Sequence, residues 1–347
     1  MNNVLEQAYP SIRELPEEWT IKQFQELLIE PVRNGIYKKK EFHGRGQKII
    51  NMGELFDYNF ISNQEMKRVE LTQKELEKNL VKDGDLLFAR RSLVLEGSGK
   101  CSIVVNPSED TTFESSIIRA RLNKDEAEPK FYYYLFHSPL GRALMASITT
   151  QTAVSGITGS NLVLLKVPHP PLISQRKITA ILSAYDHLIE NNTRRIKILE
   201  EMARSLYREW FVSFRFPGHK QVKMVDSELG LIPEEWEVKK VSEVANPCRG
   251  RSYRSIELVE EGGLPFLNLK CIERDGGFRH DGIKRYQGLS KETQTARAGD
   301  IIMAVTDMTQ ERRIVARAAR VPKTGEDIFV FSMDLVKIVP KDVISND

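Results

Sequence analysis

The chain has 347 residues, enough for two or three domains that each bury a core. Hydrophobic residues make up 41% and charged residues 29% of it, no apolar run is long enough to span a membrane, and the amino terminus lacks a signal-peptide core, so we expect a cytoplasmic protein. The net charge of +3 permits nucleic-acid binding without arguing for it. The three cysteines are too scattered for a zinc site and are interpreted as reduced, structural thiols.

The first recognisable element, an apolar-Pro-Glu-Glu-Trp segment, occurs twice. Residues 15–22 return as residues 232–239, about 217 positions later, and the Gly-Asp-apolar segment at 81–89 returns at 297–304. Two matches in one order and at nearly one offset predict a duplicated domain. The offset is too long for a solenoid repeat, so each copy is expected to be a domain.

Each copy is expected to fold into a compact mixed domain dominated by a curled β-sheet, because short alternating segments bounded by turn residues are typical of strands. The expected strands cover residues 85–89, 102–105 and 117–122 in the first copy and 300–305, 313–319 and 333–339 in the second. The first copy then adds an aromatic helix, about residues 130–147, and a Ser/Thr/Gly-rich stretch.

A long helix is predicted between the copies. Residues 172–214 contain neither proline nor glycine, whereas prolines precede and Pro217-Gly218 follows, so the helix should have roughly 40 residues and be about 60 Å long. Apolar positions alternate by four and three, as in a coiled-coil seam made of Ile178, Leu182, Tyr185, Ile189, Asn192, Ile196, Leu199, Ala203, Leu206 and Trp210. Asn192 either fixes register and partner or is a partly exposed polar gap, and the sequence favours neither.

The fold class is therefore predicted as α+β, with two similar mixed, β-rich domains joined by a long coiled-coil-type helix. The expected divisions are a first domain over residues 1–168, the central helix over 169–216 and a second domain over 217–347.

Positive charge gathers in predicted loops, which are candidate DNA contacts. In the first copy the candidates are Lys38, Lys39, Lys40, Arg45, Gln47, Lys48, Arg90 and Arg91. In the second copy they are Arg249, Arg251, Tyr253, Arg254, Arg279, Lys284, Arg285, Thr306, Gln310, Arg312 and Arg313. Cations neutralise phosphates, and Arg and Gln can read guanine and adenine edges, so loops that differ between matching copies fit two domains reading different bases. A solvated, mixed-charge surface explains any one of these residues about as well.

The sequence lacks recognised catalytic motifs. The sequence has no Gly-rich phosphate loop, no H-E-x-x-H or G-x-S-x-G, and no N-P-P-aromatic motif of the kind that adenine methyltransferases carry. We therefore predict no catalytic and no metal-binding residues in this chain.

The chain resembles the specificity subunits of type I restriction-modification systems. The resemblance rests on Pro-His-Pro-Pro-Leu-Ile-Ser-Gln-Arg-Lys-Ile at 168–178, on residues 180–192, and on Ala-Arg-Ser-Leu-Tyr-Arg-Glu-Trp-Phe at 203–211. It extends to both Pro-Glu-Glu-Trp segments and both Gly-Asp-apolar segments. Ser174 departs from the family, which usually has an acidic residue before the glutamine.

This resemblance implies two target-recognition domains, each reading half of a split double-stranded DNA sequence, with helices between them acting as a ruler. It also implies two modification subunits, which bring S-adenosylmethionine and flip an adenine for methylation, and restriction subunits that cleave with ATP and magnesium. We expect no cofactor on this chain itself and no membrane partner.

In the resembling family a second helix follows the second domain, so the chain is expected to be truncated within or just after that domain. Its exposed seam is then expected either to support antiparallel self-association or to need a modification subunit to keep the chain soluble. The alternative is a coiled-coil scaffold or assembly protein without sequence-specific readout, which would explain the helix but not the paired domains.

Overall fold

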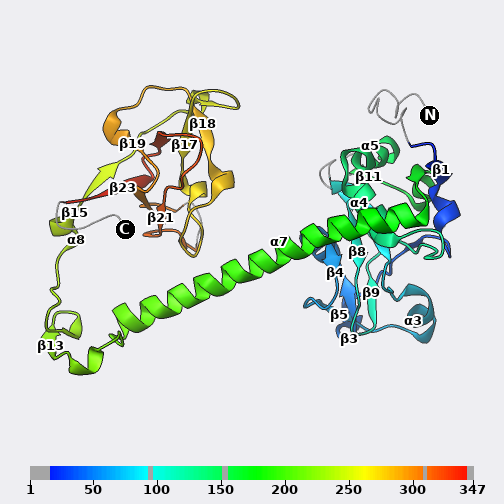
Figure 1. Cartoon of the computed structure of the whole chain (residues 1–347), viewed down its shortest axis with the longest axis horizontal. Coiled ribbons are helices and arrows are strands. Elements are labelled where there is room, and N and C mark those ends of the chain that lie inside the picture. Colours follow the sequence, from blue (N-terminus) through cyan, green and yellow to red (C-terminus); the bar gives the residue numbers. More distant parts are fainter. Residues whose placement is uncertain (1–15, 93–96, 151–154, 308–310, 342–347) are drawn as a thin grey trace. The chain divides into compact units, whose positions relative to one another are not determined.

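The structure is a computed structural model that describes residues 16–92, 97–150, 155–307 and 311–341 (Figure 1). The chain divides into two compact units, Met1–Ala203 and Arg204–Asp347. Both units contain mixed sheets, and one long helix runs from the first into the second. The predicted α+β class, with two β-rich domains joined by a helix, is confirmed. No helix in the described part of the chain is long and apolar enough to cross a bilayer.

The first unit is built on a five-stranded sheet in the order β2-β10-β6-β8-β4. Its strands are β2 (Arg33–Asn34), β10 (Ile117–Ala120), β6 (Leu86–Ala89), β8 (Cys101–Val104) and β4 (Phe60–Ile61). Every residue of β6 is buried, which explains why its sequence is continuously apolar instead of alternating. On one side the rings of Phe24, Phe88 and Phe136 meet, with centroids 5.4 Å apart for Phe24 and Phe136 and 5.1 Å for Phe88 and Phe136.

The remaining elements of this unit cover and extend the sheet. The other strands are β5 (Arg68–Val69), β3 (His43–Ile50) and β9 (Thr111–Phe113) in a second sheet, β1 (Thr20–Gln23) paired with β12 (Lys166–His169), and β7 (Arg91–Ser92) paired with β11 (Ser155–Gly156). The helices are α2 (Met52–Asp57), α3 (Gln73–Asn79), α4 (Pro129–His137), α5 (Pro139–Ile148) and α6 (Gly159–Val163).

Two expectations for the first unit were wrong in detail. The single aromatic helix over 130–147 is two helices, because Pro139 starts a new one and the Ser138 hydroxyl caps it by accepting from the Gly141 N–H at 3.2 Å. The basic segment after Tyr37 is not a loop throughout, because residues 43–50 form β3 and pair with β5 and β9.

The second unit contains a four-stranded and a five-stranded sheet. The first has the order β15 (Ala245–Arg249), β23 (Leu335–Pro340), β20 (Ile301–Ala304) and β21 (Ala318–Arg320). The second has the order β16 (Leu258–Val259), β18 (Lys284–Tyr286), β17 (Leu264–Leu267), β22 (Phe329–Phe331) and β19 (Thr295–Ala296). The strand expected over 313–319 was wrong: only β21 forms, because Arg312 and Ala316 have positive φ values of 48° and 59° that interrupt an extended chain.

Strand register confirms the predicted duplication. The antiparallel set β10-β6-β8 of the first unit corresponds to β23-β20-β21 of the second, and the parallel pair β3–β9 corresponds to β17–β22. Equivalent glycines mark the same close backbone approach in both. A Cβ atom on Gly35 would lie 2.2 Å from the Phe113 carbonyl oxygen, and one on Gly250 would lie 2.1 Å from that of Ser332. Both domains therefore require glycine at this place.

The predicted long helix is α7 (Leu172–Tyr207), which continues into a π-helical turn, Arg208–Val212. Beyond it lie the hairpin β13 (Met224–Ser227) and β14 (Gly230–Pro233), and the short α8 (Val241–Val244). Trp236 of the second Pro-Glu-Glu-Trp segment packs against Phe211 and Phe214 just after α7, with ring centroids 5.9 and 5.3 Å away.

Candidate nucleic-acid interface and helix junction

The duplicated Gly-Asp segment is a structural turn that starts the central strand of each domain. Gly84 and Gly299 have φ values of 87° and 95°, a region that favours glycine. The carboxylate after each glycine accepts from a backbone N–H three residues earlier: Asp85 from Lys82 at 2.7 Å and Asp300 from Arg297 at 2.9 Å. The motif that reveals the duplication therefore serves the fold.

Loops gather at the opposite end of that central strand, and the backbone hydrogen bonds there are equivalent in the two units. In the first unit the Arg90 N–H donates to the Ser116 carbonyl at 2.8 Å and the Ile36 N–H to that of Phe113 at 2.9 Å. In the second, the Val305 and Arg251 N–H groups donate to Asp334 and Phe331 carbonyls at 2.9 and 2.8 Å. We call this region the loop end, made of residues 35–42, 90–92 and 155–156 in the first unit and 250–257 and 305–307 in the second.

Several predicted contact residues are fastened inside their own domain. Lys38 pairs with Glu75 at 2.6 Å with a side chain only 10% exposed, and Lys48 pairs with Glu109 at 3.1 Å with 12% exposed. In the second unit Arg251 donates to the Tyr286 hydroxyl and lies 3.5 Å from a Glu257 oxygen, while the Tyr253 ring packs on Phe266 at 4.7 Å between centroids. The contacts of Arg251 and Tyr253 anchor the loop end of the second unit to its sheet, and that of Lys38 anchors the loop end of the first unit to α3.

A second group is exposed but paired with neighbouring carboxylates. The pairs are Arg45 with Glu70 at 2.6 Å, Arg279 with Asp281 at 2.6 Å, Arg285 with Glu326 at 2.7 Å and Arg313 with Glu311 at 2.7 Å. Exposed pairs of this kind contribute little, so a phosphate can compete for the cation. Thr306 donates to Asp334 at 3.2 Å, and Gln47 is half-buried in β3.

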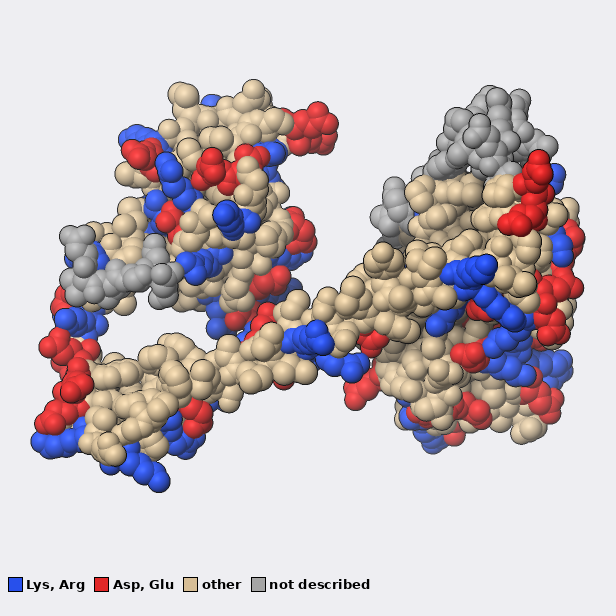
Figure 2. Space-filling model, in the orientation of Figure 1, with Lys and Arg blue, Asp and Glu red and all other residues tan. Residues whose placement is uncertain are grey.

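A third group has no ion pair with any described residue and is exposed to solvent: Lys39, Lys40, Arg91, Arg249, Arg254, Lys284 and Arg312. Arg90 is half-buried beside them, and Gln310 lies outside the described residues. Figure 2 shows positive and negative side chains interspersed on the visible face of both units, so charge alone does not locate an interface. The loop end is the best candidate in each unit: it includes Lys39, Lys40 and Arg91 in the first unit and Arg254 in the second.

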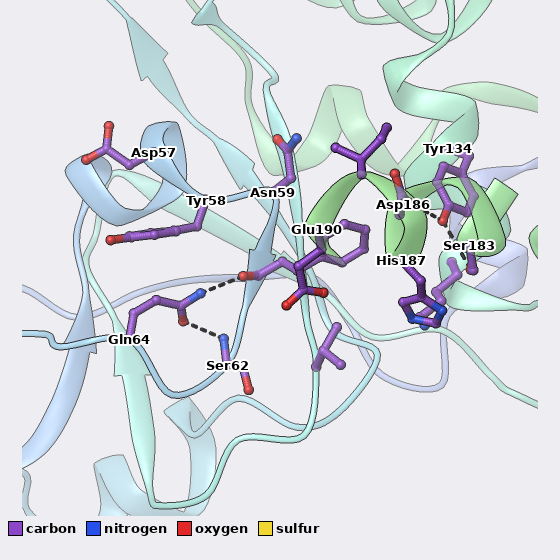
Figure 3. A pocket seen from close by; sticks show the side chains of 14 residues that line it. Asp57, Tyr58, Asn59, Ser62, Gln64, Tyr134, Ser183, Asp186, His187 and Glu190 are labelled. Carbon is purple, nitrogen blue, oxygen red and sulfur yellow. Dashed lines mark hydrogen bonds between the residues drawn. The ribbon is translucent and has the colours of Figure 1, made fainter. Parts of the chain in front are cut away.

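A junction fastens the start of α7 to the first unit. Gln175 is fully buried, and its side-chain oxygen accepts from the Glu128 N–H at 2.8 Å while its nitrogen donates to the Pro170 carbonyl at 2.7 Å. Farther along, the Tyr134 hydroxyl on α4 donates to Asp186 at 2.5 Å and lies 3.1 Å from the Ser183 hydroxyl (Figure 3). Burial and the bond to Asp186 raise the pKa of Tyr134 to about 12.

A cavity of about 580 Å³ lies beside this junction, between α7 and the segment around β4 (Figure 3). Its lining mixes aromatic rings, amides and carboxylates, among them Tyr58, Gln64, Asp186 and Glu190. No cluster of residues suited to hold a metal ion occurs anywhere in the described ranges.

The residues of the junction were not singled out from the sequence. A signal was present, because Gln175, Thr179, Ser183 and Asp186 recur at helical spacing and form a polar face. The seam itself stays exposed: Tyr185 and Ile189 are each 63% accessible, and Ile178 packs against the core of the first unit. The helix thus docks on its own domain mainly through the polar face. The seam's role in binding a partner remains a prediction.

Comparison with known proteins identifies a protein family whose model matches this chain. A model of the type I restriction modification DNA specificity domain matches residues 16–201. The chain is 28% identical over 289 residues to the type I restriction enzyme MjaIX specificity subunit of Methanocaldococcus jannaschii, covering 80% of this chain and 64% of that protein. It is 31% identical over 157 residues to the EcoKI specificity subunit of Escherichia coli, covering 45% of this chain and 33% of that protein.

Among solved structures, the fold is similar to that of a type I restriction-modification S subunit from M. genitalium. The TM-score is 0.51 at 16% identity, over 95% of this chain and 75% of that one. This likeness concerns the fold alone. The chain spans less than two thirds of the length of the curated relatives named above.

Proposed function

The chain belongs to the family of type I restriction-modification DNA specificity proteins, and we propose that it reads a bipartite double-stranded DNA target, one half with each unit. The observation that carries this proposal is the pairing of a constant frame with variable loops. Equivalent hydrogen bonds hold residues 36 and 90 in one unit and 251 and 305 in the other, yet the side chains presented there differ.

The two kinds of contact are expected to come from different residues of the loop end. Lys39 and Lys40 are exposed and suited to phosphates, which position a protein on DNA without reading its sequence. Arg91, the first residue of β7 and the second residue after β6, is exposed and suited to bidentate readout of guanine. Its counterpart Thr306 has a short hydroxyl side chain, so the two units should prefer different bases.

The chemistry is proposed to reside on partner subunits. Methyltransferase subunits would supply S-adenosylmethionine and modify an adenine in the target, and restriction subunits would supply cleavage that depends on ATP and magnesium. This chain then contributes recognition without catalysis, in the cytoplasm. A coiled-coil scaffold without sequence readout is the competing function, and it gives no reason for loops that diverge on one shared frame.

The test combines salt-dependent binding with mapping of methylated adenines. The assembled complex should methylate one bipartite sequence, and Arg91→Ala should relax base preference in one half-site while leaving the other unchanged. Lys82→Ala is the matched control, since Lys82 is exposed at the opposite end of β6. Equal loss of binding on cognate and random DNA for Arg91→Ala would contradict base readout, and salt-insensitive binding would favour the scaffold.

A further inference from the structure

We propose that Tyr134 and Gln175 are positioning residues, which fix the direction in which α7 leaves the first domain and thereby set the number of base pairs between the two half-sites. The inference rests on the proposed function, because a spacer length has meaning only for a bipartite target. On this proposal the first domain holds α7 as far as Asp186, about four turns into the helix. The stretch that sets the spacer length therefore begins at Asp186 and not at Leu172.

Two points of attachment fix the direction of α7, whereas a single point would let the helix rotate about it. Gln175 is held by backbone groups of Glu128 and Pro170 in the first turn of α7. Asp186 is held by Tyr134 eleven residues later, about 16 Å farther along the helix axis. Between them Thr179 is buried on the same face. The first four turns of α7 and the first domain should therefore move as one rigid body.

The anchor for Asp186 is itself rigid. Tyr134 belongs to α4, whose neighbouring residues Phe131, Tyr132 and Phe136 are buried in the core. Its hydroxyl donates to a carboxylate at 2.5 Å, and hydrogen bonds to charged groups are stronger than neutral ones. The bond thus ties the helix to the most deeply buried helix of the domain.

The direction of α7 must be held precisely, because the length of the helix beyond Asp186 amplifies any tilt at its attached end. Every described side chain of α7 from His187 to Tyr207 is exposed, so the described contacts give that stretch no lateral support. From Asp186 to Tyr207 the helix rises about 32 Å, and a tilt of roughly 6° at its base would move the far end by about 3.4 Å, one base-pair step. A variation of a few degrees in the direction of the helix would therefore allow more than one spacer length.

The experiment uses Tyr134→Phe, which keeps the ring and removes the hydroxyl, with Tyr207→Phe as the matched control. Tyr207 is the last residue of α7, lies outside the seam and is 63% exposed. Hydrogen exchange of residues 176–190 should become roughly tenfold faster in Tyr134→Phe and stay unchanged in the control. Asp186→Leu should accelerate the exchange of these residues to a similar extent. Asp186→Asn should keep part of the wild-type protection from exchange, because an amide oxygen still accepts from the hydroxyl.

The functional readout is the methylation by the full complex of a DNA library with constant half-sites and varied spacers. Wild type and control should accept one spacer length, whereas Tyr134→Phe and Asp186→Leu should also accept lengths one base pair shorter and longer. A single retained spacer despite faster exchange would overturn the proposal, as would altered half-site bases or unchanged exchange. If the wild-type complex methylates no bipartite site, the proposed function fails, while exchange still reports whether the junction holds the helix.

Discussion

Removing the carboxylate of Asp85 should destabilise the first domain more than any loop substitution. Asp85 is fully buried and accepts two hydrogen bonds from Arg121, both at 2.7 Å, with a third guanidinium contact from Arg119 at 3.9 Å. Burial lowers the pKa of Arg119, and Asp85 opposes that effect. In Asp85→Ala, Glu30 would be the only described carboxylate paired with Arg119 and Arg121, which are both largely buried. Breaking a buried pair in this way costs about 3–5 kcal/mol.

The second domain supplies the matched control. Asp300 occupies the equivalent turn, but its only ion partner among the described residues is Lys337 at 3.5 Å, and the two side chains are 25% and 18% exposed. Asp300→Ala should therefore cost only about 1 kcal/mol. A urea series with pulsed hydrogen exchange, read on peptides from each domain, measures both effects in the intact chain. Equal losses, or a loss below about 1 kcal/mol for Asp85→Ala, would refute the reasoning.

Three further outcomes follow from the described contacts. Replacing Lys39 and Lys40 by alanine should weaken binding to all DNA and reduce the slope of log affinity against log salt by about two, measured by fluorescence anisotropy; an unchanged slope would exclude phosphate contact. Of three free thiols only Cys248 is partly exposed, so a thiol reagent should label one thiol in the native protein and three after unfolding; three fast native reactions would contradict this. Because the pKa of Tyr134 is raised to about 12, its contribution to stability should be complete below about pH 10 and lost as the pH rises through 12. A near-ultraviolet difference titration against Tyr134→Phe measures this, and a midpoint near 10 would count against the partly buried hydrogen bond to Asp186.

The duplication and the long helix could be predicted because their signals are local. Glycine and proline bound the helix, and the repeated Gly-Asp turn needs only a positive φ and one short side chain. The details that were missed depend on competition between neighbours. Pro139 divides a segment whose apolar spacing alone suggests one helix, and positive φ values at Arg312 and Ala316 shorten a strand whose composition suggested more.

The candidate site was harder to predict because pairing over long sequence separations decides which cations are available. Lys38 finds Glu75, which is 37 residues away, and nothing in the local sequence distinguishes it from exposed Lys39. The junction was missed for a similar reason. Tyr134 and Asp186 are 52 residues apart, and their meeting depends on how α4 and α7 pack.

Equivalent positions at the loop end show how the frame can stay constant while its side chains change. Lys38 and Tyr253 follow the same close approach at Gly35 and Gly250, three residues after the glycine in each unit. One fastens its loop by an ion pair to Glu75 and the other by ring packing on Phe266. The position of the anchoring residue is the same in the two units, but the kind of contact that it makes differs. The neighbouring exposed side chains can therefore vary without loss of the strand register. Under the proposed function, this separation of anchoring residues from contact residues is what two domains would need in order to read different bases on one fold.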